Sequence, residues 1–186
     1  MLPHDPGRAD PPSRSLGGTR ARPSRGIMKQ KFDRKHPARQ PIVDIGQRSN
    51  IIFVTVCTKD RRHILDNETS HQLLLSAWEE ADALHVGRYI ILPDHVHLFC
   101  APAKRDTASL YKWITYWKAL VTKSWPNPRD KPLWQRDAWD RQLRRGDSYT
   151  AKWGYVRNNP VRHHLVNDAS KWPYQGELHV LQWHDT

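Results

Sequence analysis

The stretch YIILPDHVHLFC, residues 89–100, predicts a β-hairpin, because two apolar runs flank a Pro-Asp turn signal. Side chains alternate along a strand, so His95 and His97 would project from one face while Val96 points to the other. Two neutral imidazoles on one rigid face form a good partial ligand set for a divalent metal. Histidines at this spacing also occur as packed or solvated residues, so the pair alone leaves both interpretations open.

The rest of the chain predicts a mixed α+β domain around this hairpin. Residues 50–57 are apolar on both faces, as is typical of a central strand. Periodicity and turn signals predict four strands and three helices: strands at 50–57, 86–92, 95–101 and within 133–144, and helices at 68–84, 107–123 and 147–159, the last interrupted by Pro160. This order predicts a ferredoxin-like antiparallel sheet with helices packed on one face.

The charge of the chain favours an acidic partner, with nucleic acid as the leading candidate. The sequence has 30 Lys and Arg against 19 Asp and Glu, a net charge of +11. Ten of these basic residues and three of the acidic ones fall in residues 1–40, which also hold six prolines. We therefore expect a basic, Pro-rich, disordered arm at 1–45, a folded domain at 46–178 and a C-terminal tail at 179–186.

Targeting signals and cysteines indicate the cellular compartment. The chain has no apolar stretch of the kind found in signal peptides or membrane spans. Cys57 and Cys100 both fall in predicted strands and lack metal-type spacing, so we expect reduced, buried thiols. A cytoplasmic, nucleoid-associated protein without membrane contact is the expectation.

Tyr155 and Asn159 lie four residues apart on the last predicted helix, which places them on one face. Lys152, Arg157 and Arg162 surround the tyrosine in sequence, and a phenol near cations ionises more easily. A phenolate can attack phosphorus, and the Asn159 carbonyl oxygen would suit a metal beside two imidazoles. An ordinary tyrosine packed by its ring fits the same spacing.

Four sequence blocks occur in an order that resembles a known family. They are LPDHVHL (92–98), LWQRDAWD (133–140), YVRNNPVR (155–162) and WPY (172–174). Together they resemble the REP-associated tyrosine transposases, single-domain members of the HUH endonuclease superfamily. The resemblance covers about residues 48–176.

This resemblance implies a metal-dependent single-stranded DNA endonuclease and strand transferase that acts on hairpin-forming repeats. By analogy with the family, His95 and His97 would hold Mg²⁺ or Mn²⁺, and Tyr155 would form a 5′-phosphotyrosine intermediate. Asn159 would be the third ligand. Asn158 is the alternative, because the proline after Asn159 disfavours helical geometry at the residue before it.

Basic side chains in the predicted domain would neutralise DNA phosphates: Arg61, Arg62, Lys112, Lys118, Arg136, Arg141, Arg144 and Arg145. Trp134 and Trp139 would either stack on unpaired bases or belong to the core. The partner would be single-stranded or hairpin DNA, bound by a monomer or a homodimer.

Three other interpretations remain open at this level. The chain would be a domesticated DNA- or RNA-binding module without catalysis, a metal-dependent hydrolase that uses an activated water, or a basic α+β domain with structural histidines. A covalent DNA adduct would distinguish a transferase from the non-catalytic binding module. Cleavage that survives Tyr155→Phe would indicate the hydrolase. The absence of stoichiometric metal binding would indicate structural histidines.

Overall fold

The computed structural model describes residues 50–104, 109–144 and 146–183, all within the unit formed by residues 34–186. The predicted arm at 1–45, the start of the predicted helix at 107 and Arg145 lie outside the described residues.

An antiparallel sheet forms the centre of the described part of the chain. Its strands run in the order β4-β1-β3-β2-β5. The central order β4-β1-β3-β2 is the predicted ferredoxin-like arrangement, and the prediction of an antiparallel sheet is confirmed. The bounds are β1 Ile52–Cys57, β2 Leu84–Leu92, β3 His95–Pro102, β4 Trp139–Gln142 and β5 Gln175–Glu177.

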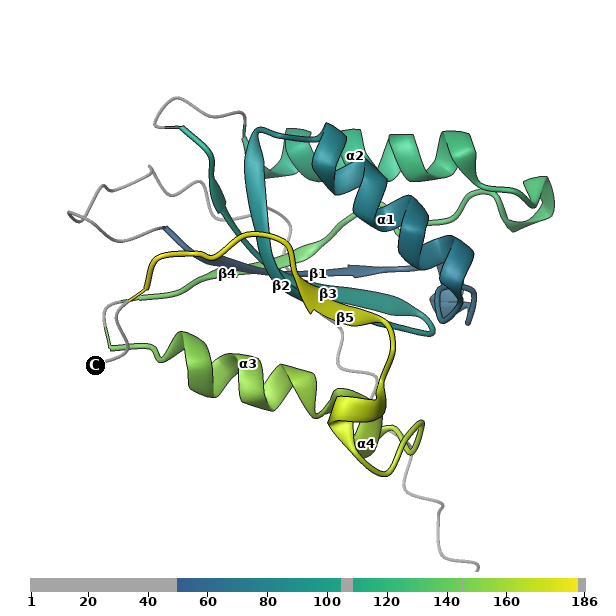
Figure 1. The fold of residues 1–186 in the computed structure, drawn as a ribbon. Helices are drawn as coiled ribbons and strands as arrows, with labels where there is room; N and C mark the ends of the chain where they lie inside the picture. The colour runs from purple at the N-terminus through teal and green to yellow at the C-terminus, as the bar shows by residue number, and fades with distance from the viewer. Residues whose placement is uncertain (1–49, 105–108, 145, 184–186) are drawn as a thin grey trace, which may run out of the picture. The chain divides into compact units, whose positions relative to one another are not determined.

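Two helices cover one face of this sheet, as predicted. They are α1 (Glu68–Glu80) and α2 (Leu110–Ser124), which lie side by side above the strands in Figure 1. Their buried side chains, among them Trp117, pack with Val54 and Leu98 of the central strands. Burial of these aromatic and aliphatic surfaces holds the helices on the sheet.

The third helix, α3 (Tyr149–Arg157), lies on the opposite face, so the prediction that all helices share one face is wrong for this element. Phe53 of β1 and Phe99 of β3 point toward this second face and pack in a core with Tyr149. Because both central strands are apolar on both sides, each face of the sheet needs a cover, and α3 supplies the second one.

The interruption predicted at Pro160 is a junction between two helices. Ser148 caps α3, its Oγ accepting a hydrogen bond from the Ala151 backbone N–H at 2.9 Å. α3 ends at Arg157, and Asn158 lies between it and the short helix α4 (Asn159–Arg162). Pro160 stands in the first turn of α4, where its missing N–H has no helical partner to lose.

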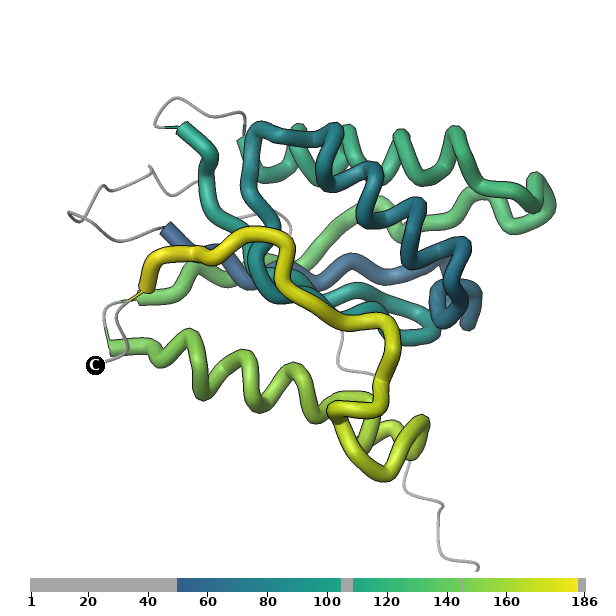
Figure 2. Tube along the Cα trace, viewed as in Figure 1, coloured from purple at the N-terminus to yellow at the C-terminus, as the bar shows by residue number. Residues whose placement is uncertain are grey.

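The C-terminal segment lies along β2, as the yellow tube in Figure 2 shows. After β5, the backbone N–H of His179 donates to Val86 O at 3.0 Å. A Cβ at Gly87 would lie 2.7 Å from the Leu181 side chain, so glycine allows this close approach. Three turns of 3₁₀ helix complete the described elements, at Lys59–Arg61, Pro128–Asp130 and Ala169–Lys171.

Alanine substitutions at two adjacent residues of β3 test whether both faces of the sheet are packed. Leu98 and Phe99 are both fully buried but face opposite layers. We expect Leu98→Ala and Phe99→Ala each to lower the free energy of unfolding by about 2–5 kcal/mol in urea titrations. Leu165→Ala, at a leucine that is 38% exposed, is the control and should cost much less. A small loss for either β3 variant would contradict a sheet covered on both faces.

Candidate functional site

The two histidines of the β2–β3 hairpin converge on one point. In the register of β1 with β3, His95 stands opposite Cys57 and His97 opposite Thr55. Both imidazoles share the α3 face with Phe99, and their Nε2 atoms lie 3.1 Å apart. The sequence prediction that both project from one face is therefore borne out by the backbone register.

Hydrogen bonds on the far side of each ring orient this pair. The His95 Nδ1–H donates to Asp94 Oδ1 at 2.6 Å, and His97 Nδ1 lies 2.8 Å from the Thr55 hydroxyl oxygen. The His97 ring also stacks on Phe53, with ring centroids 5.3 Å apart. An imidazole whose Nδ1 is held by an oxygen presents its Nε2 lone pair, the arrangement common around metal-binding histidines.

This geometry fits a divalent metal. Two nitrogen ligands each about 2.1 Å from one ion lie roughly 3.0–3.4 Å apart, depending on coordination geometry. The observed Nε2–Nε2 distance of 3.1 Å falls in that range. Within the described ranges, no group of three or more His, Cys, Asp and Glu residues could hold a metal. A further ligand would therefore come from an amide, from water or from a substrate.

The electrostatics of His97 favour a neutral imidazole. Burial, followed by the neighbouring charge of His95, holds the pKa of His97 well below its usual value. His97 is therefore neutral at pH 7, the form that binds metal ions. Burial opposes ionisation of Asp94, but the hydrogen bond and charge of His95, together with Arg61, outweigh it and keep the carboxyl pKa below its usual value.

Arg61 belongs to this site as well. Its Nε lies 2.7 Å from Asp94 Oδ2, and its Nη1 donates to Cys57 Sγ at 2.7 Å. Burial raises the pKa of the Cys57 thiol despite this neighbouring guanidinium, and Cys100 is buried with a raised pKa too. Both cysteines are free, and Cys100 is buried as predicted, whereas Cys57 is only half-buried. Their raised pKa values favour the unreactive thiol form.

Tyr155 is exposed on α3 and is held by a guanidinium. Its side chain is 68% exposed, and Arg162 Cζ lies 3.8 Å from the centroid of its ring. The same guanidinium donates to the Tyr155 carbonyl oxygen at 2.8 Å and to Asn159 Oδ1. Arg162 therefore connects the predicted nucleophile with the predicted amide ligand.

The two candidate amides differ in burial. Asn159 is 8% exposed, whereas Asn158 is an exposed residue at the end of α3. A side chain aimed at a buried metal must itself lie inward, so burial favours Asn159 over Asn158. Its Oδ1 accepts from Arg162 and retains a second lone pair.

Helix α4 and the residue after it bring Arg162 and His163 near the histidine pair. The His163 ring, just past the end of α4, packs edge-on against His95 with centroids 6.3 Å apart. The charges of His163 and Arg162 also contribute to the low pKa of His97. Sequence analysis missed His163, Asp94 and Thr55 as site residues. The roles of Thr55 and His163 depend on contacts with residues far along the chain, and that of Asp94 depends on the conformation of the hairpin turn.

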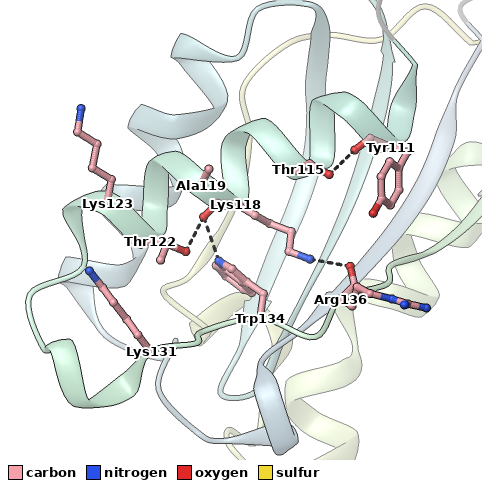
Figure 3. A pocket seen from close by; sticks show the side chains of 9 residues that line it. All are labelled: Tyr111, Thr115, Lys118, Ala119, Thr122, Lys123, Lys131, Trp134 and Arg136. Carbon is pink, nitrogen blue, oxygen red and sulfur yellow. Dashed lines mark hydrogen bonds between the residues drawn. The ribbon is translucent and has the colours of Figure 1, made fainter.

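The predicted DNA-contacting residues divide into several groups. Lys118 and Arg136 lie together on a groove beside α2 (Figure 3), whereas Lys112 and Arg144 are exposed elsewhere. Arg141 lies 3.9 Å from the carboxylate of Asp147.

Some aromatic and basic side chains serve the fold itself. Arg62 donates to backbone carbonyls of Asp130 and Pro132, so its guanidinium anchors a loop. Trp134 is 8% exposed and belongs to the core under α2, and Trp139 packs edge-on against Phe53. Among the described residues, no helix is both long and apolar enough to cross a membrane.

Two sequence relatives and one solved structure that resemble this chain are named REP-associated tyrosine transposases. A relative from Haemophilus influenzae named REP-associated tyrosine transposase is 30% identical over 95 residues, which cover 45% of this chain and 53% of that protein. The REP-associated tyrosine transposase of Escherichia coli is 26% identical over 126 residues, 66% of this chain and 73% of that protein. This chain thus spans about half the length of the first relative. No family model matches it.

A solved structure of a REP-associated tyrosine transposase bound to a REP hairpin has the same fold. The two structures superpose with a TM-score of 0.56 at 22% sequence identity, over 69% of this chain and 76% of that one. With the named relatives, this match confirms the resemblance that the four sequence blocks predict.

Substitution of the two oxygens behind the histidines should weaken metal binding. Asp94→Asn removes the carboxylate that fixes the His95 tautomer, and Thr55→Val removes the hydroxyl beside His97. We expect each variant to bind Mn²⁺ about 10–100-fold more weakly in calorimetric titrations. Asp66→Asn and Thr115→Val, at exposed residues, are the matched controls. Wild-type protein that takes up no stoichiometric Mn²⁺ would show that the histidine pair is structural.

Proposed function

We propose that this chain, a homologue of the REP-associated tyrosine transposases, cuts single-stranded DNA beside a hairpin-forming repeat and transfers the cut end. One observation carries the proposal. The Nε2 atoms of the histidine pair converge, and His163 just past α4 packs against His95, while the preceding helix α3 carries an exposed tyrosine. The repeat hairpin bound by the structural relative supports the choice of substrate.

Tyr155 is the nucleophile in this proposal. Its hydroxyl loses a proton and the oxygen attacks the scissile phosphorus, forming a Tyr–O–P bond as the bond to the 3′-oxygen breaks. The 3′-oxygen takes up a proton and leaves as a hydroxyl, and the 5′-phosphate stays on the enzyme. Because this ester conserves the energy of the phosphodiester, a second 3′-hydroxyl can displace the tyrosine without ATP. The high exposure of Tyr155 gives a DNA strand access to it.

Arg162 positions this nucleophile. Its guanidinium lies over the phenol ring and is fixed by the Tyr155 carbonyl and the Asn159 amide. Such a cation favours the developing phenolate and attracts the phosphate that the phenolate attacks. The fixed geometry means that little reorganisation is needed when the DNA arrives.

The histidines complete the site on the other side of the scissile phosphate. A Mg²⁺ or Mn²⁺ held by His95, His97 and Asn159 would supply charge stabilisation for the phosphate oxygens. The chain's own contribution is orientation, since Asp94 and Thr55 hold both rings with Nε2 inward.

One chain supplies both halves of this site, so a single copy is sufficient to nick DNA. Joining two ends by exchange uses two tyrosines, which a homodimer would supply. An enzyme that acts on chromosomal repeats works where the chromosome lies, and we therefore place this protein at the nucleoid of the cytoplasm.

Loss of the Tyr155 hydroxyl should abolish covalent chemistry. With a labelled single-stranded oligonucleotide that carries a repeat hairpin, and with Mn²⁺, wild-type protein should form an adduct that persists on a denaturing gel. Tyr155→Phe should form none, because no oxygen is left to attack phosphorus. Tyr116→Phe, at a 48% exposed tyrosine of α2, is the control and should react like wild type.

Other results of this experiment would favour the rival functions. Cleavage without an adduct that persists in Tyr155→Phe would identify a hydrolase that uses an activated water. Binding of hairpins with neither cleavage nor adduct would identify a non-catalytic binding module.

Arg162 should affect the rate of adduct formation more than DNA binding. We expect Arg162→Gln to slow single-turnover adduct formation by about 100-fold, because the cation that lies over the Tyr155 ring and would attract the phosphate is lost. Arg162→Lys should restore part of the rate. The control is Arg157→Gln, whose parent side chain donates to Gln175 of β5. Equal loss in Arg157→Gln, or a change in DNA affinity alone, would contradict this role.

A further inference from the structure

A groove beside α2 gathers positive charge outside the histidine–tyrosine site. It has a volume of about 500 Å³ and runs between the outer side of α2 and the segment that leads to β4 (Figure 3). Four of its lining residues are basic and none is acidic: Lys118, Lys123, Lys131 and Arg136 carry the charge. Such a concentration of cations fits a polyanion with phosphates along its length.

Few of these charges are neutralised by the protein. In the described part of the chain, no carboxylate forms an ion pair with Lys123 or Lys131, and both residues are exposed. Asp130, which follows α2, is used by Arg62 and by the Trp125 indole. Arg136 pairs with Asp137 at 3.2 Å on an open surface, where such a pair is weak.

The walls of the groove are tied together, so its shape is fixed before any ligand binds. Lys118 Nζ donates to the carbonyl oxygens of Gln135 at 2.6 Å and Arg136 at 3.2 Å. In the other direction, the Trp134 indole N–H donates to Lys118 O at 3.3 Å. Figure 3 shows the bonds of Lys118 with Arg136 and of Trp134 with Lys118 crossing from the helix to the facing segment.

The groove adjoins the end of the sheet that carries the histidines. The Gln135 backbone N–H donates to Cys57 O at 2.9 Å, and the Lys59 N–H donates to Leu133 O at 2.6 Å. Cys57 is the last residue of β1 and stands opposite His95 in the strand register. The groove therefore ends beside the last residue of β1, and the histidine pair lies at the same end of the sheet on its α3 face.

We propose that this groove binds the backbone of the single-stranded DNA that flanks the hairpin and leads it toward Tyr155. The inference rests on the proposed function and names the surface that holds the flank. Lys123, Lys131 and Arg136 contact successive phosphates, while Lys118 keeps the groove open. Tyr111, which is 48% exposed at its rim, offers a ring on which an unpaired base can stack.

The salt dependence of DNA binding tests this proposal. Two substrates are compared, a repeat hairpin with a single-stranded flank and the same hairpin without it. For the flanked substrate, Lys123→Ala and Lys131→Ala should each reduce the slope of log K against log salt by about 0.7, and together by about 1.4. Each loss corresponds to an affinity about fivefold lower at 0.1 M salt. The hairpin without a flank should bind all variants alike.

Lys171→Ala, at an exposed lysine of the last 3₁₀ turn, is the matched control and should leave both slopes unchanged. Equal slopes for the wild type and the double variant on the flanked substrate would overturn the proposal. Equal losses on both substrates would overturn it too, because they would place the lysines on the duplex.

Adduct formation by the wild type on the flanked hairpin reports the proposed function separately. If no adduct forms, the transferase function fails, whatever the slopes. If an adduct forms but the wild type and the double variant have equal slopes on the flanked substrate, the transferase function stands and only the proposed role of the groove is refuted.

Discussion

The pairing of β1 with β3 is the constraint on which the site depends. Its register sets Thr55 against His97 and Cys57 against His95, and residues directly opposite each other share a face of the sheet. A slip by one residue would turn the partners of both histidines to the other side, because the side-chain period of a strand is two. The Thr55 hydroxyl would then point into the core under α1 and α2. The orientation of His97 is thus a consequence of how two strands pair.

The sheet separates two kinds of surface. Its α1–α2 face is filled by tryptophans and aliphatic side chains, and it holds the strands rigidly. Its α3 face combines a smaller core around Phe99 with the polar cluster of His95 and His97. α3 therefore both covers apolar surface and carries the proposed nucleophile, and the turn at Asn158 redirects the chain so that His163, just past α4, reaches His95. Packing and chemistry depend on the same helix.

Local sequence patterns predict much of this arrangement. The alternation in 89–100 predicts the hairpin. The four-residue spacing of Tyr155 and Asn159 predicts one face of a single helix, whereas Tyr155 is exposed on α3 and Asn159 is buried at the start of α4. The face of the sheet that α3 covers could not be predicted, because its short apolar pattern fits either side. β5 could not be predicted either: its residues, Gln-Gly-Glu, have no strand signal and pair only because β2 offers a free edge.

In the site too, the roles of some residues depend on contacts with residues far along the chain. Arg61 and Arg62 are adjacent in sequence and equally basic, yet one pairs with Asp94 and the other anchors the loop at 130–132. Their different roles depend on acceptors far along the chain, which composition does not reveal. The role of Arg162 likewise depends on the turn between α3 and α4, which places its guanidinium over the Tyr155 ring.

The central claim is that the nucleophile and a metal-binding histidine pair share one site. ¹⁹F NMR of protein labelled with 3-fluorotyrosine tests it directly, with the Tyr155 signal assigned from the Tyr155→Phe variant. One equivalent of Mn²⁺ should broaden the Tyr155 resonance more strongly than the signals of Tyr111 and Tyr116 on α2. A Tyr155 signal that is unaffected, or broadened no more than the two on α2, would contradict the account.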